Sequence, residues 1–128
     1  MEIDRALAHG DEMFDLGFDA GVTAALGAIK AMRRALPPGV RSEVLSLDTH
    51  PGHRVSVLLT VYIDSTMTRG RQQLREVLDA LDESPTIEHT VPGGTVILRF
   101  AHPLGVYHVV TWPFVCHAAG LHIDEPAA

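Results

Sequence analysis

The spacing of apolar residues alternates between helical and strand-like along this chain, and that order constrains the fold most. Over residues 11–36, apolar side chains from Phe14 to Leu36 recur every three or four positions, which predicts one long amphipathic helix. Acidic residues lie near its start and basic residues near its end, which suits the helix dipole. The Pro-Pro-Gly run at 37–39 ends it.

A β-hairpin is predicted next, from two segments in which apolar and polar residues alternate. The segments are residues 44–47 and 55–63, and the loop 49–53 between them contains Pro and Gly. Pairing residue 47 with residue 55 gathers apolar side chains of both strands on one face, as a half-buried sheet requires. That face contains Leu45, Leu47, Val55, Val57 and Leu59.

Residues 66–83 predict a second helix, which begins at a cap formed by Thr66 or Thr68 and ends at Ser84-Pro85. A β-meander of three strands follows, at Thr86–Pro92, Thr95–His102 and Val106–Trp112. Gly93-Gly94 and Pro103-Leu104-Gly105 supply its two turns. The first turn predicts that Val91 opposes Val96, His89 opposes Leu98 and Ile87 opposes Phe100, and it sets Glu88 opposite Arg99 as an ion pair.

The element order is therefore α-β-β-α-β-β-β. We expect a single α+β domain over residues 1–128, built on a mixed or antiparallel five-stranded sheet. Both helices are expected on one face of that sheet, because each has one apolar side to bury.

The composition indicates an ordinary globular chain and argues against several classes of function. Of the 128 residues, 46% are hydrophobic and 20% are charged, with a formal net charge of −6. This acidic balance and the scattered basic residues argue against a nucleic-acid partner. The single Cys116 excludes an internal disulfide. No segment has the length of a membrane helix or the pattern of a signal peptide, so we expect a cytoplasmic protein without a membrane partner.

The most unusual feature is a stretch of 38 residues, from Thr86 to Ile123, in which only Glu88 and Arg99 are charged. About eight charges would be expected at the average of the chain. One face of the meander packs on the helices of its own domain, and the other face is too apolar to be left in water. Either the tail 113–123 folds back over that face, or a second subunit covers it. On the subunit hypothesis the contact residues are Ile97, Tyr107, Val109 and Thr111, with Phe114 beyond them.

A second stripe on the first helix consists only of small residues, which permit close backbone approach. It lies either on the sheet of the same chain or against a second subunit. Its members are Gly17, Gly21, Ala24, Ala28, Ala31 and Ala35, and on the subunit hypothesis the first four join the interface.

Histidines and the cysteine are the candidates for chemistry. His50 and His53 share one loop, and the predicted register puts His89, His102 and His108 on one sheet face. No carboxylate follows at the spacing of a known metal motif. In an extended segment Cys116 and His117 point to opposite faces and cannot act as a nucleophile–base pair. We therefore expect no catalytic residue, no metal and no cofactor.

The segment Arg54–Glu83 runs from an alternating strand through Val61-Tyr62-Ile63-Asp64 into a helix. With the order long helix, hairpin, helix and strands, it resembles the tail-terminator and neck proteins of siphophages. The resemblance implies a small α+β subunit that closes into rings in a virion and carries no catalytic residues. The long Gly/Ala-striped first helix and the three-strand ending depart from that pattern.

The expected function is accordingly a non-enzymatic, self-associating structural or adaptor subunit, with its own copies or other protein subunits as partners. The alternative is a small enzyme or ligand-binding domain that uses the histidine-bearing sheet face. Phage or virion assembly is the more specific form of the first hypothesis, and it adds the virion as a location.

Overall fold

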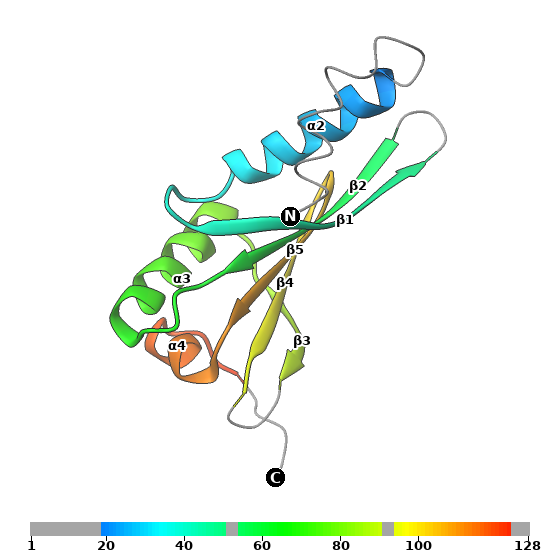
Figure 1. Ribbon diagram of the computed structural model, residues 1–128. Helices are drawn as coiled ribbons and strands as arrows, with labels where there is room; N and C mark the ends of the chain where they lie inside the picture. The colour runs from blue at the N-terminus through cyan, green and yellow to red at the C-terminus, as the bar shows by residue number, and fades with distance from the viewer. Residues whose placement is uncertain (1–18, 51–53, 91–93, 124–128) are drawn as a thin grey trace.

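The computed structural model describes residues 19–50, 54–90 and 94–123. These residues form three helices and five strands (Figure 1). In chain order the elements are α2 (Asp19–Arg34), β1 (Arg41–His50), β2 (Arg54–Tyr62), α3 (Met67–Leu81), β3 (Thr86–Thr90), β4 (Val96–His102), β5 (Gly105–Thr111) and α4 (Pro113–Ala118).

The strands make one mixed sheet in the order β1-β2-β5-β4-β3. β2 and β5 run parallel at its centre, and the other neighbours are antiparallel. The connection from β2 to β5 contains α3, β3 and β4, so it spans more than forty residues. This arrangement confirms the predicted α+β class with a five-stranded sheet.

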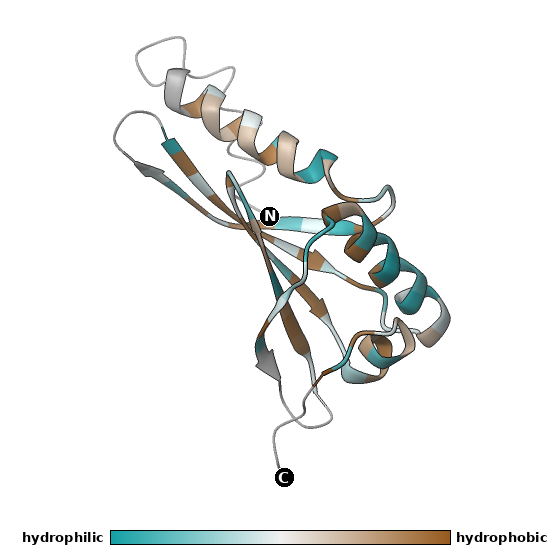
Figure 2. Cartoon of the chain, turned by 180° about the vertical axis from the view of Figure 1, so that it is seen from behind, coloured by the Kyte–Doolittle hydropathy of each residue, from teal (hydrophilic) through white to brown (hydrophobic). Residues whose placement is uncertain are grey.

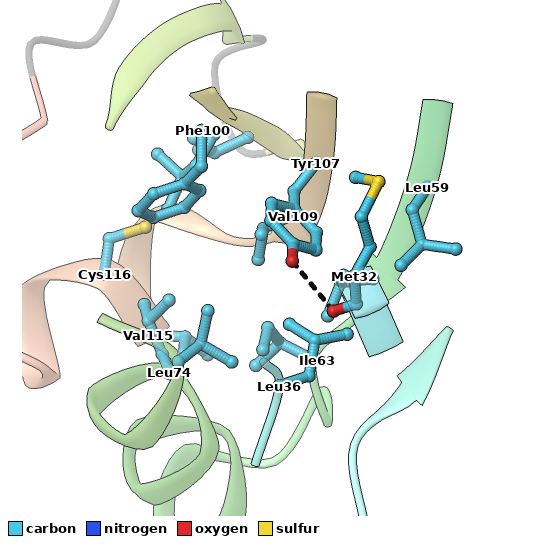
Figure 3. Packing of buried hydrophobic residues seen from close by; sticks show 14 of the residues in the cluster. Met32, Leu36, Leu59, Ile63, Leu74, Phe100, Tyr107, Val109, Val115 and Cys116 are labelled. Atoms are coloured by element: carbon cyan, nitrogen blue, oxygen red, sulfur yellow. Dashed lines mark hydrogen bonds between the residues drawn. The ribbon is translucent and has the colours of Figure 1, made fainter. Parts of the chain in front are cut away.

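All three described helices contribute to one apolar core on one face of the sheet, which we call the inner face. Figure 3 shows that Met32 and Leu36 from the α2 end, Leu74 of α3, and Val115 and Cys116 of α4 belong to one core over the strands. The apolar stripes on α2 and α3 therefore face the sheet, as their spacing predicts. Figure 2 shows the hydrophilic residues of α3 on its outer side. The largest fully buried side chains are Tyr107, Phe100, Met32, Leu59, Leu74 and Leu98.

A buried hydrogen bond ties the end of α2 to the sheet. The Tyr107 hydroxyl donates to the carbonyl of Met32 at 2.8 Å (Figure 3). In a regular helix that carbonyl would accept from the amide of Leu36, but this amide donates to Arg33 instead. Because the last carbonyls of a helix need partners from outside it, Tyr107 supplies one that the helix lacks.

The register of the β1–β2 hairpin differs from the prediction. Leu47 pairs with Val57, and a bulge lies between Val44 and Ser46. The bulge leaves Leu45 49% exposed, whereas Val44 is fully buried. Assigning Leu45 to the apolar face was therefore wrong, because an extra residue in one strand reverses the alternation beyond it.

The predicted register of the β3–β4 hairpin is also wrong. Thr90 pairs with Val96 and Ile87 with Leu98, with a bulge between Ile87 and His89. Arg99 consequently faces Thr86, so the expected Glu88–Arg99 pair is not formed. The turn is longer than a two-residue Gly-Gly loop, and Val91 lies outside the described residues.

A shorter turn between β4 and β5 changes which residues face the helices. His102 pairs with Gly105, so two residues form the turn, and Gly105 belongs to the strand. Gly105 is required there because a Cβ atom would lie 1.9 Å from the Val57 carbonyl oxygen. Tyr107 therefore pairs with Phe100 and Val109 with Leu98, on the inner face.

The segment after β5 forms a helix rather than an extended tail. Pro113 begins α4, as proline favours the first helical position. Val115 and Cys116 are fully buried, and α4 packs beside α3. The tail 113–123 thus belongs to the core on the inner face and does not cover the opposite face. Among the described helices, none combines the length and the apolar character that crossing a bilayer requires.

Candidate functional site: the open face of the sheet

The face opposite the helices, which we call the open face, is covered by none of the described elements. Strand pairing arranges its side chains in three rows across β1, β2, β5 and β4. The Tyr62 row contains Arg41, Tyr62, Val110 and Ile97; the His108 row contains Glu43, Thr60, His108 and Arg99; the Leu58 row contains Ser46, Leu58, Val106 and Ala101.

The His108 row contains two charged residues, Glu43 and Arg99, on either side of His108. Nε2 of His108 lies 2.7 Å from a carboxylate oxygen of Glu88. Glu88 sits in the bulge of β3, and its side chain reaches across β4 to His108 on β5. The two side chains are 22% and 45% exposed, so this contact with solvent-accessible partners contributes little to stability.

The Tyr62 row is held by contacts at the start of β1. The Tyr62 hydroxyl donates to Glu43 at 2.9 Å, and the Arg41 guanidinium lies 4.8 Å from the centre of the Tyr62 ring. The hydrogen bond to Glu43 is the main cause that raises the pKa of Tyr62 above its usual value. These contacts fix Arg41 at one end of the open face.

Two hollows mark this face. A shallow groove of about 260 Å³ lies over the Leu58 and His108 rows and reaches Asp48 on β1. A cleft of about 410 Å³ lies where β2 and β5 end, and Arg41, Tyr62, Asp64 and Trp112 line it.

Asp64 is oriented at the edge of this cleft. Its carboxylate accepts hydrogen bonds from the Thr66 amide at 2.8 Å and from the Thr66 hydroxyl at 2.5 Å. These bonds, led by the hydroxyl, lower the pKa of Asp64, so the carboxylate stays charged at neutral pH. Its amide donates to the Gln73 side chain at 2.8 Å, which ties the end of β2 to α3.

No family model, curated protein or solved structure matches this chain.

The structure divides the predicted sheet contact residues between two faces. Tyr107, Val109 and Thr111 are at most 1% exposed and lie on the inner face, so assigning them to a subunit contact was wrong. Ile97 lies half-buried on the open face, as predicted. Phe114 is 44% exposed but belongs to α4, on the helical side of the sheet.

The small-residue stripe of the first helix lies partly on the chain itself. Ala28 is 3% exposed and joins the core, which supports the alternative that the stripe packs on its own sheet. Ala24 is half-buried, and Gly21 belongs to the first turns of α2. Gly17 lies outside the described residues.

The structure does not place His102 and His108 on the same face of the sheet, as the hypothesis of a histidine-bearing face requires. His102 contacts the inner-face Tyr107, with ring centres 5.7 Å apart, whereas His108 lies on the open face. The two cannot share a ligand across the hairpin. Within the described ranges, no group of three or more His, Cys, Asp or Glu side chains is placed to hold a metal ion. His53 lies outside those ranges.

Cys116 is buried in α4 beside the core. Burial raises the pKa of its thiol to about 11. The thiol is therefore protonated at neutral pH, which is the state of a structural rather than a nucleophilic cysteine.

Sequence reasoning missed the residues that define the open face. On β2 and β5, residues of the open face alternate with core residues. The turn predicted before β5 put Val106 and Val110 on the inner face, and Leu58 was not considered as a contact residue. The signal for Val106 and Val110 was present in the strand alternation, but it required the correct turn length before β5. The Glu88–His108 contact had no local signal, since it depends on a bulge.

Proposed function

We propose that this chain is a non-enzymatic structural or adaptor subunit that self-associates through the open face of its sheet. The observation that carries the proposal is that apolar side chains line two of the three rows on a face that no described element covers. Leu58, Val106, Val110 and Ile97 are all half-buried there. Apolar side chains gathered on one uncovered face are typical of a subunit contact.

The sheet edges are less suited to association than the face. β1 and β3 are the two edge strands, and each is interrupted by a bulge. Bulges break the regular row of backbone groups that another strand would need for pairing. The chain therefore offers a sheet face to a partner, and its edges resist extension of the sheet.

The phage hypothesis is a more specific form of this proposal. It rests on the element order, which resembles that of the ring-forming tail-terminator and neck proteins. We propose on that basis that the assembly serves a phage or virion, with the subunit made in the cytoplasm.

Two neighbouring leucines on β2 give a matched test. Leu58 points to the open face, and Leu59 is fully buried on the inner face. Leu58→Lys should keep the far-UV circular dichroism and the melting temperature of the wild type but reduce the mass in solution, because an ammonium in a dry contact is costly. Leu59→Lys should instead prevent folding. If the wild type associates and Leu58→Lys leaves its mass unchanged, the open face is not the contact.

A further inference from the structure

Charges lie at both ends of the β1–β2 hairpin on the open face. Arg41 begins β1 and lines the cleft, and Asp48 lies near the other end of the same strand. Both are exposed. Strand geometry separates them by about 20 Å along β1.

β2 repeats the arrangement with the signs reversed. Arg54 begins this strand at the hairpin end, and Asp64 follows it at the cleft end. Arg54 is exposed, and the Asp64 carboxylate is held in one orientation by Thr66. Each strand of the hairpin thus carries one basic and one acidic group at its two ends, in opposite order.

We propose that the open face packs against the open face of a second copy across a two-fold axis, with the two hairpins antiparallel. This inference rests on the proposed function and specifies its geometry. An axis that lies between the sheets and perpendicular to the strands sets β1 over β1 of the partner and β2 over β2 of the partner.

A single alignment of the two copies along their strands brings opposite charges together on both β1 and β2. When Arg41 of one copy lies over Asp48 of the second copy, strand pairing places the axis level with Leu59, midway along β2. The same axis brings Arg54 of one copy over Asp64 of the second. The second pair was not used to choose the register, so it supports the arrangement independently.

The side chains in the rows between these ends are also compatible across the proposed contact. The axis sets the Leu58 row of one copy over the His108 row of the other, so Arg99 meets Ala101, His108 meets Val106 and Glu43 meets Ser46. No charged residue of the three rows meets a residue of like charge. The occupant of this face is therefore a second copy, because the face complements itself.

A cross-linking experiment tests the geometry directly. Ser46 lies next to the proposed axis, and Ser65 lies at the cleft end, far from its own counterpart in the second copy. Ser46→Cys treated with a short bismaleimide should give a covalent dimer, and Ser65→Cys should not, although Ser65 is the more exposed position. The native Cys116 is buried and gives no background.

Charge reversal tests the register. Arg41→Glu and Asp48→Arg should each raise the dissociation constant of the dimer about tenfold, because two pairs become repulsive in each homodimer. An equimolar mixture of the two variants should restore association, since both pairs are then attractive. The melting temperature of each variant serves as the control for folding.

The outcomes separate this inference from the proposed function. If the wild type associates but Ser65→Cys cross-links as well as Ser46→Cys, or the mixture of charge variants does not recover, the two-fold arrangement is wrong and self-association remains. A head-to-tail ring, which joins different surfaces of neighbouring copies, would give that result. A wild type that stays monomeric overturns both.

Discussion

Replacing Tyr107 with Phe removes one hydroxyl from the centre of the core and leaves every other contact of the ring in place. The hydroxyl donates at 2.8 Å to the Met32 carbonyl, and Tyr107 is 1% exposed. No water reaches such a site to replace the donor. A buried acceptor left without a partner costs about 1–3 kcal/mol. For a chain of this size, that corresponds to a fall in melting temperature of about 4–11 °C.

Tyr62→Phe is the matched control, because it also removes one hydroxyl that donates to an oxygen. Its acceptor is Glu43, at 2.9 Å on the open face, where solvent can replace the lost donor. This variant should lose less than about 1 kcal/mol. Thermal and urea unfolding of the wild type and both variants would measure the difference. Equal losses in the two variants, or a wild-type melting temperature for Tyr107→Phe, would refute the role of this bond at the end of α2.

Three further predictions follow from the same core. Burial raises the pKa of Tyr107 to about 12 from its ordinary value of 10.0. The contribution of this residue to stability should therefore be constant below pH 10 and fall as the pH rises toward 12. In alkaline urea titrations, Tyr107→Phe should lack this slope. Gly70→Ala should destabilise the protein by about 1–3 kcal/mol, because its Cβ would lie 2.3 Å from the Asp64 carbonyl oxygen. Gly27→Ala in α2, where a Cβ meets nothing, should stabilise it by about 0.5–1 kcal/mol. Unfolding curves in which both variants change the free energy of unfolding in the same direction would contradict this prediction. Cys116 should not react with a thiol reagent in the native protein and should react once the chain is unfolded in denaturant, while rapid labelling of native protein would show that the burial of α4 is wrong.

The element order as far as β5 and the faces of α2 and α3 could be predicted because each depends on local spacing, whereas the short helix α4 was missed. The stripe that contains Ile29 and Met32 predicts the side of α2 that meets the sheet, and both residues are buried. Of the two threonines predicted to cap α3, Thr66 occupies the N-cap position, although its side chain makes no capping hydrogen bond. In each case the preference of the sequence and the packing of the fold agree.

Which side chains of each strand face the helices could not be predicted with the same success. An error of one residue in a turn or a bulge moves every later side chain of the strand to the opposite face. Reading Pro103-Leu104-Gly105 as the turn moved Tyr107, Val109 and Thr111 to the wrong face, whereas Gly105 is a strand residue that lies against the backbone of Val57. The pairing of Glu88 with Arg99 lent false support to a register, since opposite charges two residues apart in register still lie on the same face. Bulges at Leu45 and Glu88 leave no pattern in the sequence that distinguishes them from regular strand.

The mass of the wild-type protein in solution tests most directly whether the open face is a contact between copies of the chain. A monomer of this chain has a mass of 13.9 kDa. Light scattering coupled to size exclusion, over a series of loading concentrations, should give a mass at or above twice that value, falling toward the monomer on dilution. A mass that remains at 13.9 kDa at every concentration would contradict the claim.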